Sequence, residues 1–298
     1  MHLLHRCVSR VDYQVSIRAN ATIQRLTSIQ MEFAGHHPPA SDGIQVELSV
    51  KEMPDLSSWQ VLISSGPGWG IHQRDNERCL CLGSPTAIPQ TGLTACWDRD
   101  ASRATVYCGS EWVREGPDGL EMRYTAGYPV DQILFMYYLA SRQGLLVHAA
   151  GLVRDGRALL FPGVSGAGKS TLSRQFLTVG DPGLLSDDRI IVRWLDDVWQ
   201  AFGTPWPGDA GIAVNAGAPL GAILFPAKAS ETSIRALSPQ EALDRLLPAT
   251  SILWHEPELL TDQLATTERL LREIPAFELA WSLEKGVVDD VREFVSRL

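Results

Sequence analysis

The run Gly163-Val-Ser-Gly-Ala-Gly-Lys-Ser170 constrains the fold of this chain more than any other part of its sequence. An apolar, strand-like segment at 158–161 precedes it, and Leu172 and Phe176 then share one helical face. This order predicts a strand that ends in a glycine-rich loop and opens directly into a helix. This half of the chain is therefore expected to be α/β.

The same loop predicts a site for phosphate groups. Unpaired backbone N–H groups gather where such a loop enters a helix, and the helix dipole favours negative charge there. Lys169 is expected to reach the β and γ phosphates of ATP or GTP, and the Ser170 hydroxyl to bind Mg²⁺. The alternative is a glycine-rich turn that binds nothing. The expected nucleotide-binding residues are Gly163, Val164, Ser165, Gly166, Ala167, Gly168, Lys169, Ser170 and Thr171.

Phosphoryl transfer also needs an acid that holds the metal and a residue that orients or deprotonates the nucleophile. Asp187 and Asp188 are the leading candidates, because they stand at a strand junction shortly after the expected helix. Adjacent residues on a strand face opposite ways, so one acid could address Mg²⁺ and the other the acceptor hydroxyl. The alternative is a solvated turn. His148 lies in an apolar strand before the loop, where a histidine is more often a core residue than a catalyst.

These residues together resemble the bacterial HPr kinase/phosphorylase family. The resemblance lies in the order of His148 on a strand, a short hairpin, the loop from Gly163, and Ser186-Asp187-Asp188 about one helix later. It covers about residues 143 to 298 and implies a P-loop core related to phosphoenolpyruvate carboxykinase, which phosphorylates a serine hydroxyl on a partner protein. Carried over, it implies that His148, Asp187 and Asp188 belong to the active site, with one aspartate as general base and the other near the metal. Together with the loop, the expected catalytic residues are Asp187, His148 and Lys169, and the expected Mg²⁺ ligands are Ser170 and Asp188.

The chain departs from that family at two places. Thr171 stands where HPr kinases usually have Glu, and 204–209 with Asn215 replaces their Pro-Gly-Arg-Asn run. The second departure argues against the reverse, phosphorolytic reaction and against HPr as the substrate. The chain is more similar to HPr-kinase-like proteins found beside peptide-modifying systems, some of which phosphorylate a peptide serine. Trp206 would then offer a stacking face for substrate or nucleotide, or else pack on the core.

Two domains are expected. Residues 1–128 alternate short β-favouring runs, such as 45–50 and 104–108, with turn residues, and are expected to be mostly β, with an open role. Residues 129–298 are expected to form the P-loop domain, an α/β fold with a mixed sheet and antiparallel hairpins. It begins with a buried helix at 131–140, and a capping box with proline predicts another helix from Ser238.

The composition of the chain argues against some classes of binding partner. The net charge is −9 and both signs are mixed along the chain, so nucleic acid and anionic lipid are not expected partners. No apolar run is long enough for a membrane span, and the N-terminus lacks a signal-like stretch. The five cysteines form no CxxC pairs, which favours reduced thiols in a cytoplasmic protein. Homo-oligomers are common in the resembling family, although nothing in the sequence itself demonstrates one.

The leading expectation is an enzyme that transfers the γ-phosphate of Mg·ATP to a serine hydroxyl of a peptide or protein. Either aspartate could serve as base or as metal ligand. A second hypothesis keeps this chemistry but gives it a small acceptor, such as free serine. A third is an ATP-sensing interaction module without turnover.

Overall fold

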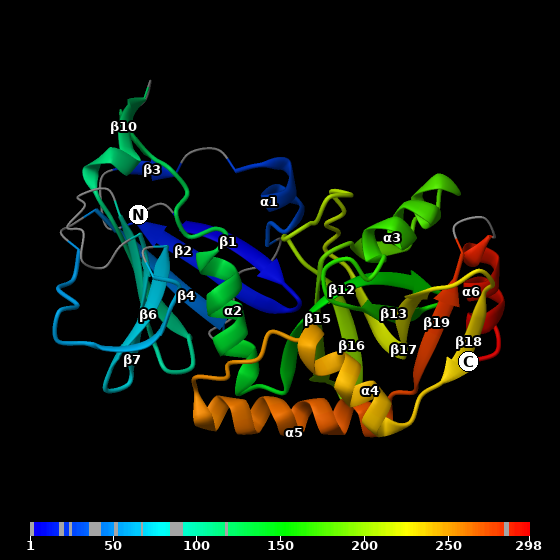
Figure 1. Ribbon diagram of the computed structural model, residues 1–298. Helices are drawn as coiled ribbons and strands as arrows, with labels where there is room; N and C mark the ends of the chain where they lie inside the picture. The colour runs from blue at the N-terminus through cyan, green and yellow to red at the C-terminus, as the bar shows by residue number, and fades with distance from the viewer. Residues whose placement is uncertain are drawn as a thin grey trace. The chain divides into compact units, whose positions relative to one another are not determined.

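The computed structural model describes residues 3–17, 21–23, 26–35, 43–50, 53–66, 68–83, 92–116, 119–282 and 286–298. The chain divides into two compact units, Met1–Tyr138 and Leu139–Leu298. Both are built on large sheets, the second of them with helices on both faces, and the fold is mixed α/β with more strand than helix among the described residues (Figure 1). The boundary thus falls later in the chain than the expected position near residue 128.

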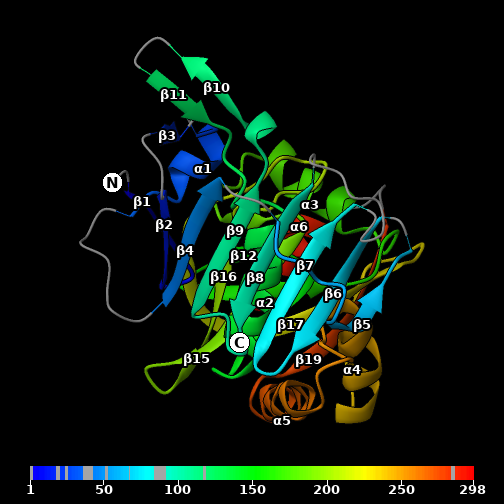
Figure 2. The ribbon, with the colours of Figure 1, turned by 90° about the vertical axis from the view of Figure 1, so that its left-hand side faces the viewer.

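The first unit contains an eight-stranded sheet, seen face-on in Figure 2. Strands β2, β4 and β9 pair in parallel, and the other pairs are antiparallel. A separate sheet has the order β10-β11-β3. In sheet order, the large sheet comprises β1 (Leu3–Val8), β2 (Val11–Ile17), β4 (Gly43–Val50), β9 (Arg103–Cys108), β8 (Leu93–Asp98), β7 (Glu77–Leu82), β6 (Trp69–Arg74) and β5 (Gln60–Ser64). The small elements are β3 (Ala21–Ile23), α1 (Ser28–Glu32), η1 (Ser110–Trp112), β10 (Val113–Gly116) and β11 (Gly119–Met122).

Helix α2 (Val130–Ala140) packs against one face of this sheet. The Tyr13 and Phe135 rings stack with centroids 5.8 Å apart, and Trp97 meets Tyr137 edge-on at 5.1 Å. A buried ion pair also joins Arg6 to Asp131 on the helix, with 2.9 Å between nitrogen and oxygen. These contacts explain why the helix lies mainly with the β-rich unit, whereas the sequence placed it with the P-loop domain.

The second unit is built on a sheet in which the paired strands form a closed ring. Its order is β13-β12-β15-β16-β17-β19-β18, and β17 also pairs with β13 in parallel. The strands are β12 (Gly144–Arg154), β13 (Arg157–Pro162), β14 (Leu184–Ser186, paired with β12), β15 (Arg189–Leu195), β16 (Val198–Gly203), β17 (Gly217–Lys228), β18 (Ser233–Ala236) and β19 (Ala276–Trp281). The β12–β13 hairpin turns at Asp155 and Gly156, both with positive φ, as its sequence predicts.

Successive side chains on the central strands point alternately into two hydrophobic cores, one on each face of the sheet. On β12, Val147 and Ala149 face one core, while Ala150 and Leu152 face the other. Helices α4 (Pro239–Leu246) and α5 (Pro257–Glu273), with η2 (Leu247–Ala249), cover the first core, and α3 (Lys169–Thr178) and α6 (Val287–Val295) cover the second (Figure 1). Strands buried on both faces explain the continuous apolar runs of this half.

The capping box at Ser238 and Glu241 is present, with proline at the first turn of α4. Helix α5, however, has no counterpart in the expectations. Its buried face includes Gln263, Thr266 and Thr267, and these polar residues hide the apolar period that marks a helix in sequence. Among the described residues, no helix has the length and apolar character that crossing a membrane requires.

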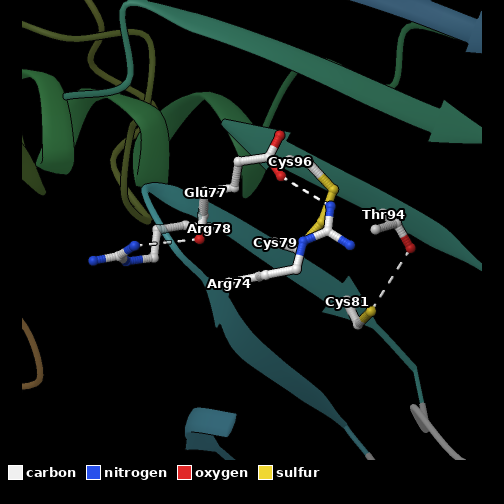
Figure 3. The surroundings of a disulfide bond; sticks show 7 residues. All are labelled: Arg74, Glu77, Arg78, Cys79, Cys81, Thr94 and Cys96. Carbon is white, nitrogen blue, oxygen red and sulfur yellow. Dashed lines mark hydrogen bonds and ion pairs between the residues drawn. A yellow bond between two sulfur atoms is a disulfide. The ribbon is translucent and has the colours of Figure 1, made fainter. Parts of the chain in front are cut away.

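The expectation that all cysteine thiols are reduced is wrong for one pair. Cys79 on β7 and Cys96 on β8 form a disulfide (Figure 3). The register of these strands sets the two residues directly opposite each other, with 4.1 Å between their Cα atoms. The two cysteines lack any metal-type or redox-type spacing in the chain, so the sequence alone gave no sign of this pairing.

Candidate active site

The loop from Gly163 connects the end of β13 to the start of α3. Gly166 and Gly168 have φ values of 83° and 94°, which side chains other than glycine rarely adopt. A Cβ atom on Gly163 would lie only 2.6 Å from that of Ala167, so glycine is required there for packing. The strand, loop and helix therefore follow the order that the motif predicts, with α3 beginning at Lys169.

Lys169 lies folded over its own loop. Its ammonium group donates hydrogen bonds to the carbonyl oxygens of Gly163 at 2.6 Å and Val164 at 3.2 Å, and the residue is buried. Burial is the main reason that the pKa of Lys169 lies below its ordinary value, although the charge of Asp188 opposes this shift. A buried ammonium that is bonded only to neutral carbonyls is ready to exchange them for an anion.

Asp188 and His148 form a pair beside this loop. The His148 Nε2 lies 2.9 Å from Asp188 Oδ1, and both side chains are about a quarter to a third exposed. Burial alone would raise the pKa of Asp188. The hydrogen bond from His148 and the nearby cations Arg189 and Lys169 outweigh burial, so this pKa lies below its ordinary range. Asp188 is therefore an ionised carboxylate at neutral pH.

Backbone hydrogen bonds tie this pair to the loop. The N–H of Gly163 donates to the carbonyl of His148 at 3.1 Å, and the N–H of Ala149 donates to the carbonyl of Asp188 at 3.0 Å. Strand β12 therefore holds the first residue of the loop on one side and Asp188 on the other. His148, Asp188 and Lys169 meet because β12 lies between β13 and β15 in the sheet.

Asp187 has different surroundings. It is 1% exposed, and its carboxylate accepts hydrogen bonds from the backbone N–H groups of Gly208 at 2.9 Å, Ala210 at 2.7 Å and Ile212 at 3.1 Å. Three amide donors from one segment satisfy most of the capacity of this carboxylate. Asp187 thus holds the segment 204–212 in place.

The 204–212 segment lies directly against the aspartate pair. A Cβ atom on Gly208 would stand 2.8 Å from Asp187 Oδ2 and 3.0 Å from the Cβ of Asp188. Thr204 also anchors the segment, because its hydroxyl donates to the carbonyl of Arg189 at 2.8 Å. Trp206 is 5% exposed, which fits a packing role better than an open stacking face.

Sequence reasoning missed two residues of this site. Arg189 follows the aspartate pair, lies opposite His148 in the β12–β15 register, and places its Nε 3.5 Å from Asp188 Oδ2. Gly208 was grouped only with a proline-rich loop. The position of Arg189 directly after Asp188 is a sequence signal that could have suggested its role. The role of Gly208 depends on its contact with Asp187 and Asp188, which the sequence does not show.

Comparisons with known proteins do not extend this picture. No protein-family model matches the chain, and a search of curated proteins finds no match. The resemblance to HPr-kinase-like proteins therefore remains a prediction from the motif residues.

Proposed function

We propose that Leu139–Leu298 is a P-loop kinase unit of the HPr kinase type, which transfers the γ-phosphate of ATP to a serine hydroxyl of a peptide or protein. The observation that carries this proposal is the hydrogen-bonded pair of His148 and Asp188, held beside the loop lysine. A phosphate-binding loop alone fits any nucleotide-binding protein. A carboxylate and histidine beside it supply the acid–base groups that transfer to a hydroxyl needs.

In this proposal Lys169 and the loop amides bind the phosphates of ATP. Lys169 leaves the carbonyls of Gly163 and Val164 and donates instead to phosphate oxygens, where its bonds become charge-assisted. Its pKa, which burial lowers in the free protein, then rises toward the ordinary value, because the phosphates supply a negative partner. ATP binding is thus expected to take up protons at alkaline pH.

Asp188 is the acid that we assign to the reacting groups. Its carboxylate is ionised and partly exposed, and it is already oriented by His148, so it can accept the proton of a serine hydroxyl. Asp187 is instead a positioning residue, since its carboxylate is buried and bonded to three loop amides. The sequence leaves open which aspartate is the base, and we propose Asp188 for this role.

The residues present also suit Mg²⁺. The described residues contain no cluster of three metal-binding side chains, and Mg²⁺ in such sites is usually held by one or two protein oxygens together with substrate phosphates. Ser170 at the start of α3 is the oxygen donor that would hold it together with the phosphates of ATP, because Asp188 is assigned here to the proton of the hydroxyl. When bound, Mg²⁺ neutralises charge on the phosphates.

The test is to incubate the full chain with Mg·ATP and an extract of the host cell, and to locate new phosphate by mass spectrometry. The expected result is phosphoserine in a peptide or protein, formed by the natural chain and not by Lys169→Ala. Phosphate found only on a free metabolite would support the small-acceptor alternative. Tight ATP binding with no loss of γ-phosphate would overturn the kinase assignment in favour of ATP sensing.

A further inference from the structure

The β-rich unit also contains a cluster of reactive side chains around the Cys79–Cys96 disulfide. The register of the strands sets His72 on β6 opposite Cys79 on β7, and Cys79 opposite Cys96 on β8. Cys81 follows on the same face of β7, because side chains two residues apart on a strand point the same way (Figure 3). Three sulfur atoms and one imidazole therefore share one face of the sheet.

This face carries a groove of about 660 Å³, and Cys96 is one of its lining residues. The two halves of the disulfide differ in exposure. Cys79 is 0% exposed, whereas Cys96 is partly exposed. A thiol that enters the groove can therefore attack only the sulfur of Cys96, and Cys79 must be the leaving group.

The residues around Cys79 fit a leaving thiol. His72 is 4% exposed, and its Nδ1 is a buried polar atom with no hydrogen-bond partner in the described part of the chain. His72 is the cross-strand partner of Cys79, and a reduced Cys79 would carry an S–H donor that the disulfide lacks. Arg74 and Glu77 form an ion pair in the next row of the same face (Figure 3).

We propose that Cys79 and Cys96 form a reversible thiol–disulfide exchange site for a small thiol of the glutathione class, with Cys96 as the sulfur that is attacked. The incoming thiolate forms a bond to Cys96 Sγ, the Cys79–Cys96 bond breaks, and Cys79 leaves with the bonding electron pair and takes a proton from solvent. A second thiol then attacks the sulfur of the bound thiol, which releases Cys96 and forms the oxidised small disulfide. Two small thiols thus supply the two electrons.

Cys81 and Cys108 are internal controls. Burial raises the pKa of the Cys81 thiol despite its contact with Thr94, and burial raises the pKa of Cys108 to about 11. Both residues hold little thiolate at neutral pH, and Cys108 is also fully buried. Neither is expected to react at the rate of Cys96.

The test treats the folded full chain with reduced glutathione, blocks free thiols with an alkylating reagent, and maps adducts by peptide mass spectrometry. We expect glutathione on Cys96 and none on Cys79, and oxidised glutathione should restore the disulfide. A disulfide that opens only in denaturant, adducts on both cysteines alike, or free thiols at both positions before any reduction would each overturn the proposal.

Three variants sharpen this test. With oxidised glutathione, Cys79→Ser should accumulate a mixed disulfide at Cys96, and Cys96→Ser should accumulate none at Cys79. His72→Phe should need about two- to tenfold more reduced glutathione to open the disulfide, because the reduced state loses one hydrogen bond. Circular dichroism checks that each variant folds, and the mapping on the natural chain decides the proposal if a variant does not. An unchanged midpoint in His72→Phe would contradict the role of that ring.

Discussion

Asp187 and Asp188 are neighbours in the chain, yet their carboxylates lie in opposite surroundings. Asp187 is buried and bonded to the backbone N–H groups of Gly208, Ala210 and Ile212. Asp188 is partly exposed and bonded to His148. The two residues form the bend between β14 and β15, and this bend places one carboxylate against the 204–212 segment and the other beside His148 and the loop lysine. This separation of roles can be tested directly.

Replacing Asp188 should affect activity more than stability. Asp188→Asn keeps the shape of the side chain but removes the negative charge that accepts a proton. We expect kcat for phosphoryl transfer to fall about 10²- to 10⁴-fold. The free energy of unfolding should change by less than about 1 kcal/mol, since the group is partly exposed. Phosphopeptide formation and urea unfolding measure the two quantities, and an unimpaired kcat would contradict the assignment.

Replacing Asp187 should have the reverse effect. Asp187→Asn places an NH₂ group among backbone N–H donors, so at least one buried amide loses its acceptor. The expected loss in free energy of unfolding is about 1–3 kcal/mol. Activity should fall mainly through loosening of the 204–212 segment, which limited proteolysis of folded protein can report. A variant as stable as the natural chain would show that these three hydrogen bonds contribute little.

The loop lysine should be essential for turnover and dispensable for folding. Lys169→Ala removes a side chain that, within the described part of the chain, donates hydrogen bonds to the carbonyls of Gly163 and Val164. We expect loss of γ-phosphate transfer by about 10²-fold or more. Circular dichroism and the melting transition should stay close to those of the natural chain. Lys169→Arg is the matched control, since it keeps the charge but changes its reach.

Acid should remove the contribution of Asp188 to stability. Its folded-state pKa lies below the ordinary value of 3.8. A carboxyl group with a lowered pKa stabilises the fold above its unfolded pKa, and that contribution is lost as pH falls through the folded pKa. The stability of the natural chain relative to Asp188→Asn should thus be constant above about pH 5 and decline below about pH 4. Urea unfolding at a series of pH values measures this, and a difference that grows in acid would contradict it.

Gly208 should be intolerant of a side chain. A Cβ atom there would meet Asp187 Oδ2 at 2.8 Å, so Gly208→Ala must displace either the segment or the carboxylate. We expect a loss of about 1–3 kcal/mol in unfolding free energy, as for other overpacked sites. Ala210→Gly is the matched control, because it keeps the N–H that Asp187 accepts and adds no atom. Equal stability of the two variants would argue against close packing here.

Local sequence signals were sufficient for much of the second unit. The glycine-rich loop, the Asp155-Gly156 turn and the capping box at Ser238 each act within a few residues, and each has the expected structure. Helix α5 was missed because its buried face is partly polar. Gln263 on that face bonds through its side-chain amide to the backbone of Leu253 and Ser251, and such bonds are invisible to a hydrophobic period.

The sequence by itself determined the strand, loop and helix around Lys169 and marked His148 and the two acids as candidates, because these features depend on residues close together in the chain. Only the tertiary structure separated Asp187 from Asp188, since the amides that hold Asp187 come from a segment about 20 residues further on. It alone also joined Cys79 to Cys96 and placed α2 with the β-rich unit. Strand register and packing between distant segments decide such pairings, and neither is written in a local pattern.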